Sequence, residues 1–204
     1  MLRTLTFTTG AIAIALVLAG CQSDAPTGPA AAFTLSSTAF KEGDAFPSRF
    51  ACPAGFGAIA GTNSSPPLAW SNEPKGTQSV AIVLDDPDAP TSSGQKATFT
   101  HWITWGIAPG TLALAAGSNG PSVGDNDLAP FAPSLGLPQS VYRNYFGACP
   151  PPGSGTHRYI FRAYALSSPL TLAAGASRSA FDAAIAGKVL AEARVTTTVN
   201  SNAP

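Results

Sequence analysis

The chain has 204 residues, a size that suits one domain with short tails and makes two full domains unlikely. Its 11 basic and 11 acidic residues cancel, so the basic excess that nucleic-acid binding needs is missing and that partner class is mostly excluded. Charged residues make up 11% and hydrophobic residues 45%, which allows a sizeable core and argues against disorder of the whole chain.

The first twenty residues have the pattern of an export signal. A single basic residue, Arg3, precedes the apolar run 11–19, which is shorter than the roughly 20 apolar residues that span a bilayer. The run ends in the sequence LAGC, which resembles a bacterial lipobox, where small residues precede a Cys that becomes the lipidated N-terminus. An ordinary signal peptide with an incidental Cys is the alternative. We predict a lipoprotein signal peptide over residues 1–20 and lipidation of Cys21.

The segment after the lipidated Cys predicts a flexible tether through residue 32, because residues 22–32 are small, contain Pro and lack periodicity. Gln22 follows the Cys where an Asp would favour retention at the inner membrane of a Gram-negative bacterium, so the outer membrane is expected. Loss of the signal peptide removes Arg3 and no other charged residue. The mature chain has no polybasic segment that could act as a second anchor to the membrane. We therefore expect a lipid-anchored envelope protein that faces the periplasm.

Two cysteines, Cys52 and Cys149, remain if Cys21 is acylated. Exported proteins fold in an oxidising compartment, where two remaining thiols tend to pair. We therefore predict a disulfide between two positions that lie 97 residues apart. The chain-entropy model gives about 4–5 kcal/mol as an upper estimate for a loop of this length. Two buried free cysteines are the alternative.

Short apolar or alternating runs separated by turn residues, with 20 Gly and 19 Pro in the chain, predict a body made mostly of strands. The predicted strands are 33–40, 49–52, 68–71, 79–85, 99–107, 111–115 and 158–166. Residues 80–84 are continuously apolar, which suits a strand buried on both faces. The pattern favours a β-dominated α+β sandwich and not a series of βαβ units.

One helix is predicted near the C-terminus, from about Ser179 to Gly187. Ser179 can cap it, an apolar stripe follows, and Gly187 can end or bend it. Residues 188–193 can continue as a further helical turn, and residues 194–199 alternate like a closing strand. The segment 117–146 is rich in Gly and Pro and shows no assignable pattern.

An acidic corner and a histidine are the first two candidate functional motifs. The sequence DDPDAP at 85–90 directly follows the buried strand, and its prolines restrict the backbone around three carboxylates. Asp-Pro is also a common turn opener, so turn chemistry alone explains the corner equally. The second motif is His101-Trp102 inside a predicted strand, where a lone His is more often a packed core residue than a ligand.

The third motif is the Pro-rich stretch 147–153 followed by His157-Arg158-Tyr159. Proline lacks an N–H donor and restricts the backbone, so it can form the wall of a pocket. His157 and Tyr159 are two residues apart on a predicted strand and therefore share a face. If both histidines meet Asp86, imidazole and tyrosine can donate to an anion while the carboxylate orients or charges a histidine.

Together these motifs resemble the phosphatidylethanolamine-binding protein family, and in particular its bacterial branch, often called Raf kinase inhibitor-like proteins. No single motif is specific, but their order and spacing agree over about residues 33–195, nearly the whole mature chain. The matching segments are FKEG at 40–43, SPPLAW at 65–70, DPDAP at 86–90, HW at 101–102 and CPPPGSGTHRY at 149–159.

The resemblance implies a domain over residues 33–199, followed by a tail at 200–204. Its fold is expected to be an antiparallel sandwich with a large central sheet, a smaller sheet and short C-terminal helices. It also implies a pocket for a phosphate-like anion, including phospholipid headgroups. By match to the family motifs, the residues expected at this pocket are Asp86, Asp88, His101, Trp102, Pro150, Pro151, His157 and Tyr159. Many relatives carry a Tyr near the C-terminal end that is absent here, which puts one pocket wall in doubt.

The first function expected is a non-enzymatic binding protein with an anionic ligand and without cofactor or metal, which binds more strongly as pH falls through about 6–7. The alternative is an interaction protein that inhibits a protease or a kinase-like partner, as some family members are described. A serine hydrolase is a third reading, since residues 120–124 fit G-x-S-x-G, but no strand precedes Ser122. A zinc site of His101, His157 and Asp86 lacks the usual close spacing of ligands.

Overall fold

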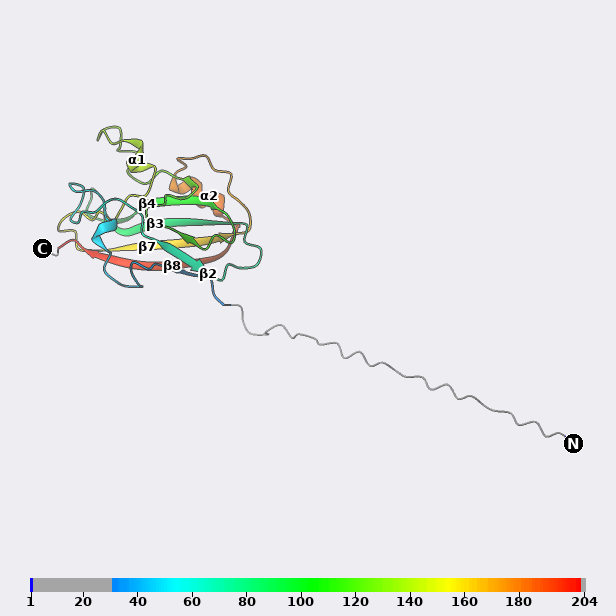
Figure 1. The fold of residues 1–204 in the computed structure, drawn as a ribbon. Helices are drawn as coiled ribbons and strands as arrows, with labels where there is room; N and C mark the ends of the chain where they lie inside the picture. Colours follow the sequence, from blue (N-terminus) through cyan, green and yellow to red (C-terminus); the bar gives the residue numbers. More distant parts are fainter. Residues whose placement is uncertain (2–30, 203–204) are drawn as a thin grey trace. The chain divides into compact units, whose positions relative to one another are not determined.

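Antiparallel strands in two sheets form the framework of the computed structural model, which describes Met1 and residues 31–202 (Figure 1). The larger sheet has the order β6-β4-β3-β7-β8 and the smaller one the order β1-β2-β5. The strands are β1 Thr34–Ser36, β2 Leu68–Ser71, β3 Ser79–Pro90, β4 Lys96–Ile107, β5 Ala113–Leu114, β6 Ser122–Val123, β7 Thr156–Leu166 and β8 Val189–Asn200. Apart from Met1, the predicted signal peptide lies outside the described residues, as do Cys21 and most of the tether.

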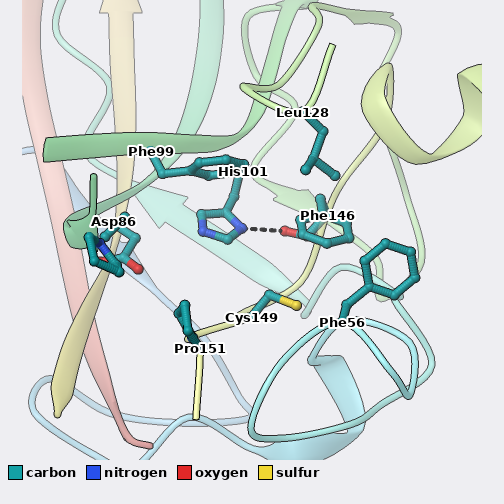
Figure 2. A pocket seen from close by; sticks show the side chains of 10 residues that line it. Phe56, Asp86, Phe99, His101, Leu128, Phe146, Cys149 and Pro151 are labelled. Atoms are coloured by element: carbon teal, nitrogen blue, oxygen red, sulfur yellow. Dashed lines mark hydrogen bonds between the residues drawn. The ribbon is translucent and has the colours of Figure 1, made fainter. Parts of the chain in front are cut away.

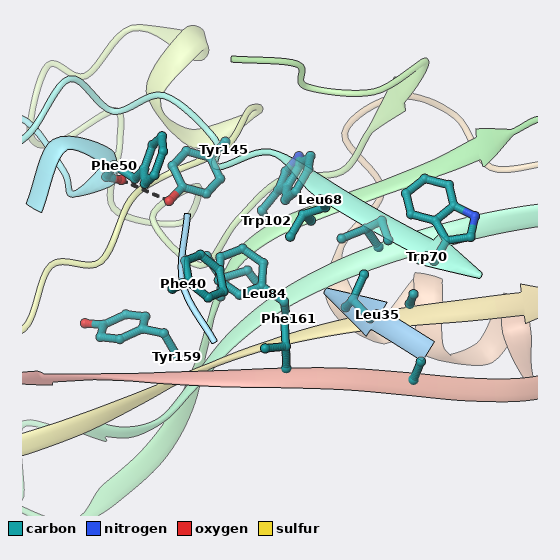
Figure 3. Packing of buried hydrophobic residues seen from close by; sticks show 14 of the residues in the cluster. Leu35, Phe40, Phe50, Leu68, Trp70, Leu84, Trp102, Tyr145, Tyr159 and Phe161 are labelled. Carbon is teal, nitrogen blue, oxygen red and sulfur yellow. Dashed lines mark hydrogen bonds between the residues drawn. The ribbon is translucent and has the colours of Figure 1, made fainter. Parts of the chain in front are cut away.

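The core lies on both faces of the larger sheet, whose long strands run side by side in Figure 1. On one face, Leu84, Trp102 and Phe161 pack with residues of the smaller sheet (Figure 3). On the other face, Val83 and Ile103 pack against helix α2, Arg178–Ile185. The apolar run 80–84 in the first half of β3 has no exposed surface, as the sequence pattern predicted. These features confirm the β-dominated α+β sandwich.

Two predicted elements are wrong. Residues 49–52 do not form a strand: a 3₁₀ turn, Ser48–Phe50, follows Pro47 and places the Phe50 ring in the core. Residues 188–193 do not continue the helix, because Gly187 adopts a φ of 73° and the chain then enters β8. This strand pairs with β7 along most of its length, and that long-range pairing overrides the local helical preference of Leu, Ala and Glu.

The boundaries of the other elements differ by a few residues from those predicted. Helix α2 begins at Arg178 because the side chain of Ser177, two residues before the predicted cap, accepts a hydrogen bond from the N–H of Ala180. Only Thr34–Ser36 of the predicted strand 33–40 is paired. No helix within residues 31–202 is long and apolar enough to cross a membrane.

The segment 117–146 contains only the short β6 and one turn of helix, α1, Gln139–Tyr142. The buried side chain of Asn126 holds it together by donating hydrogen bonds to the carbonyls of Val141 and Asn144, at 2.9 and 3.3 Å. A salt bridge of 2.7 Å between Arg143 and Asp125 closes the same excursion. Side-chain contacts to backbone therefore replace regular secondary structure here, which explains why the sequence shows no periodicity.

The disulfide predicted between Cys52 and Cys149 is present, with the two Cα atoms 5.5 Å apart. It joins the loop after the 3₁₀ turn to the Pro-rich stretch that precedes β7. The two segments approach so closely that a Cβ atom on Gly147 would lie 2.3 Å from the carbonyl oxygen of Phe50. Only glycine fits there, so the Gly before the Cys-Pro-Pro sequence has a packing reason.

Candidate ligand pocket

A β-bulge in β4 aims the first predicted histidine. Leu84 of β3 pairs with Trp102, but the next residue, Asp85, pairs with Thr100, so His101 is an extra residue without a partner. Trp102 therefore remains in the core beside Leu84, while His101 turns into a pocket at this end of the sheet. The bulge therefore explains why one of two neighbouring strand residues lies in the core and the other lines a pocket.

The pocket has a volume of about 240 Å³ and a mostly apolar lining (Figure 2). Its polar side chains are Asp86 and His101, and Figure 2 shows the imidazole of His101 between Asp86 and Phe146. The other lining residues are Phe56, Ala89, Pro90, Phe99, Leu128, Phe146, Cys149 and Pro151. A small polar group bound at Asp86 and His101 would therefore be surrounded by apolar surface.

His101 is held in one orientation. Its Nδ1 lies 3.0 Å from the carbonyl oxygen of Phe146, to which the N–H donates, and its ring lies edge-on to Tyr159 at 5.3 Å between centroids. Burial lowers the pKa of His101 to about 4, although the nearby charge of Asp86 acts in the opposite direction. His101 is therefore neutral at pH 7, with Nε2 left as a hydrogen-bond acceptor. In the free protein it gains charge near pH 4, below the pH 6–7 of an ordinary histidine.

Asp86 connects the pocket to the second histidine. Its Oδ1 accepts the N–H of Asp88 at 2.8 Å, and its Oδ2 accepts the Nδ1–H of His157 at 2.6 Å. The other nitrogen of His157, Nε2, lies 2.8 Å from the hydroxyl oxygen of Ser154. The side chains of Asp86 and His157 are 3% and 1% exposed, so this pair is almost completely removed from water. The carboxylate thus faces the pocket and fixes the imidazole behind it.

Comparison with known proteins identifies the family of this chain. The family described as "Phosphatidylethanolamine-binding protein" matches residues 36–200. The chain belongs to the phosphatidylethanolamine-binding protein family. A "UPF0098 protein" of Methanothermobacter thermautotrophicus is 38% identical over 161 residues, which cover 79% of this chain and 94% of that protein. A protein of Mycobacterium tuberculosis named as a candidate lipoprotein, LppC, is 37% identical over 170 residues, 83% of this chain and 73% of that one.

Solved structures of the phosphatidylethanolamine-binding protein family have the same fold. Escherichia coli YbcL, described as a member of the mammalian family, gives a TM-score of 0.68 at 27% identity and covers 82% of this chain and 98% of its own. The Chlamydia trachomatis homologue CT736 gives 0.67 at 29% identity, with 82% and 97% covered. The resemblance and the fold expected from the sequence motifs are therefore confirmed.

The other two carboxylates of the acidic corner at 85–90 lie away from the pocket. Asp88 is bonded to Arg158 Nε at 2.7 Å and to Lys96 Nζ at 2.9 Å, and its hydrogen bonds with Arg158 hold its pKa far below the usual range. Asp85 faces the opposite side of the sheet, where it pairs with Arg178 of α2 and where burial raises its pKa. These two residues tie β3 to β4, β7 and α2.

Four further residues taken from the family motifs do not line the pocket. Trp102 packs edge-on against Tyr145 in the core, with the ring centroids 5.6 Å apart. Pro150 accepts a backbone hydrogen bond from Ala58, which holds the loop that carries Phe56. His157 and Tyr159 are buried in β7, and burial together with the charge of Asp86 raises the pKa of the Tyr159 phenol far above its ordinary value.

Of the residues expected from the sequence, Asp86, His101 and Pro151 are the ones that line the pocket. Sequence reasoning missed the aromatic and aliphatic walls, Phe56, Phe99, Leu128 and Phe146, which come from the loop after the 3₁₀ turn, from β4 and from the segment 117–146. It also missed Ser154, whose signal was a hydroxyl in a Gly-Ser-Gly turn three residues before His157.

Two other chemistries considered from the sequence find no support in the described residues. Ser122 of the G-x-S-x-G sequence lies in the edge strand β6. The chain has two histidines, and their rings are bonded elsewhere, His101 to the Phe146 carbonyl and His157 to Ser154. Ser122 therefore has no imidazole partner. Within residues 31–202, no three His, Cys, Asp or Glu side chains are grouped so that they could hold a metal ion.

Proposed function

We propose that this protein is a lipid-anchored binding protein of the cell envelope whose pocket takes a small phosphate-like anion. The observation that carries the proposal is the buried pair of polar side chains, Asp86 and His101, at a small pocket with apolar walls. Membership of a family named for a phospholipid supports an oxyanion as the ligand. Its source can be a phospholipid headgroup or a free phosphate, since both present the same oxygens.

The polar groups of the pocket determine which protonation state of the ligand and of His101 allows binding. Asp86 and the neutral His101 Nε2 both accept hydrogen bonds, and Pro90 and Pro151 supply no backbone N–H. An anion that brings no proton would meet only acceptors and the charge of Asp86. Binding must therefore include a proton, either on the ligand as P–OH or taken up by His101 to make an imidazolium.

The affinity for inorganic phosphate is therefore expected to rise as pH falls. The pKa of His101 is about 4 in the free protein, and a bound anion raises it. Between these two pKa values each binding event takes up one proton, so affinity increases by up to about tenfold for each unit of pH decrease. Calorimetry below about pH 6, where a phosphate group keeps a single charge, measures this slope. An affinity independent of pH over that range contradicts proton-coupled binding.

The substitution His101→Asn tests the residue itself. The Asn amide can still donate to the carbonyl of Phe146 in place of Nδ1, but it removes the Nε2 atom. Loss of a charge-assisted hydrogen bond of about 1.5–3 kcal/mol should weaken phosphate binding by roughly 10-fold to 150-fold. Lys75→Gln, on an exposed turn, is the control and should bind as the native protein does. Equal affinity in His101→Asn and the control would remove His101 from the proposal.

Two ligands distinguish the possible sources of the anion. Inorganic phosphate carries only the oxygens, whereas glycerophosphoethanolamine carries a complete phospholipid headgroup without acyl chains. If the pocket serves headgroups, the second ligand binds more tightly, because its apolar and ammonium groups add contacts beyond the oxyanion. If free phosphate is the ligand, the order is reversed.

The anchor is tested separately at Cys21. Cells that express Cys21→Ala should show no radioactive palmitate in this protein, and the protein should leave the membrane fraction, because the mature chain has no polybasic patch to hold it. The neighbouring substitution Ser23→Ala is the control and should stay labelled. The lipoprotein name of the M. tuberculosis relative supports this assignment. Palmitate that remains in Cys21→Ala would show that the predicted lipid site is wrong.

A further inference from the structure

Ser154, His157 and Asp86 form a continuous chain of hydrogen-bonding side chains next to the pocket. The Ser154 Oγ lies 2.8 Å from His157 Nε2, and His157 Nδ1 lies 2.6 Å from Asp86 Oδ2. The order of groups is hydroxyl, imidazole and carboxylate, with both distances inside the range of a nucleophile activated by an oriented base. The binding function proposed above uses only the pocket-facing side of Asp86.

The imidazole in this chain is fixed in the tautomer that catalysis requires. Asp86 accepts the Nδ1–H, which leaves Nε2 directed at the serine oxygen. Asp86 is itself held by the N–H of Asp88, and the His157 side chain is 1% exposed. Neither group can turn away without breaking a buried hydrogen bond.

The serine is more accessible than its two partners. Ser154 is half-buried and lies between Gly153 and Gly155, whose φ angles are 78° and 93°. A Cβ atom on either glycine would meet no atom within 4 Å, so the turn is open at both glycines, while the hydroxyl itself also lies 3.1 Å from the Ser201 hydroxyl oxygen. Pro151, whose carbonyl oxygen accepts from Ser154 Oγ at 2.6 Å, belongs to the pocket lining. Because Ser154 is only half-buried, a small molecule can approach it from outside the turn.

A donor for a developing negative charge is present beside the serine. The N–H of Gly155 makes no hydrogen bond within residues 31–202. Gly155 directly follows Ser154, which is the position that supplies one oxyanion donor in hydrolases with a nucleophile on a tight turn. The hydroxyl has one proton, which it can give to the Pro151 carbonyl, to Ser201 or to His157, so it must turn to the imidazole before it can attack.

We propose that Ser154 is the nucleophile of a hydrolase for small carboxylic esters, with His157 as general base and Asp86 as the residue that orients His157. The proposal goes beyond ligand binding and does not depend on it. Ser154 does not line the pocket and touches it only through the carbonyl of Pro151, so the ester would meet the serine at the turn between Gly153 and Gly155.

The reaction needs only water as a second substrate. Ser154 Oγ forms a bond to the ester carbonyl carbon while its proton moves to His157 Nε2, and the Gly155 N–H faces the resulting oxyanion. The bond to the alcohol oxygen then breaks, and Nε2 returns the proton to that oxygen. Water attacks the acyl-serine with His157 again as base, which releases the carboxylic acid and restores Ser154.

The test uses the full-length protein in detergent, with a fluorophosphonate probe and p-nitrophenyl acetate. Mass spectrometry should find the probe on Ser154. Ser154→Ala should lose the label and about 100-fold of the hydrolysis rate, the contribution typical of a positioned acid–base pair. Ser122→Ala, which removes the serine of the G-x-S-x-G sequence, is the control and should keep both.

Three results would overturn the proposal: no label on the native protein, a label on another residue, or a hydrolysis rate in Ser154→Ala within twofold of the native rate. A urea unfolding midpoint of Ser154→Ala close to the native one verifies that this variant is folded. Binding of inorganic phosphate separates the two proposals, because a failure at Ser154 leaves the His101-dependent binding intact.

Discussion

Substitution of both Cys52 and Cys149 by Ser is expected to lower the free energy of unfolding by about 4 kcal/mol. The disulfide closes a loop of 97 residues, so its removal gives the unfolded chain a large gain in conformational entropy. The bond also holds the loop that carries Phe56 against the segment of Cys149, and both residues line the pocket. Urea unfolding followed by tryptophan fluorescence measures the change.

The reductant dithiothreitol provides the matched control for this prediction. Reduced native protein should unfold at nearly the same urea concentration as the double Ser variant, and the variant itself should not respond to reductant. Intact mass after alkylation without reductant should show neither Cys52 nor Cys149 modified. Equal unfolding midpoints for the oxidised native protein and the variant would contradict the expected stabilisation.

Asp86→Ala is expected to destabilise the fold by about 3–5 kcal/mol, the usual effect of removing one partner from a buried ion pair or hydrogen-bonded pair. The substitution leaves the Nδ1–H of His157 and the N–H of Asp88 without acceptors in a region closed to water. Both groups would keep the full desolvation penalty of an unpaired donor. Urea unfolding at pH 7 measures the loss.

Asp182→Ala is the control for Asp86→Ala. The Asp182 side chain is 52% exposed and pairs with Arg178 one helical turn away, so its loss should change stability by less than about 1 kcal/mol. Similar losses in the two variants would mean that burial of the Asp86–His157 pair has no special energetic weight. Asp86→Asn should recover part of the stability, because its amide oxygen can still accept from His157.

The cysteine pairing could be predicted from the number of cysteines, and the long strands could be predicted from the local hydrophobic pattern. Three cysteines, one of them in a predicted lipobox, leave two for the oxidising compartment expected of an exported protein, and pairing follows from redox chemistry without knowledge of the fold. The run 80–84 is apolar at every position, so it can only be buried on both faces. The helix predicted for residues 188–193 was wrong because β8 gains its hydrogen bonds from β7, which is distant in the sequence and invisible to a local pattern.

The sequence by itself determined the family, the long strands and the two polar side chains of the pocket, Asp86 and His101, because these depend on motifs and hydrophobic pattern. Only the tertiary structure decided which of those residues meet. The bulge at His101 depends on how β3 and β4 pair, and it separates His101 from Trp102. The contact between Asp86 and His157 spans 71 positions, and the link to Ser154 follows from it. Such contacts arise from chain folding in three dimensions, so no pattern along one strand records them.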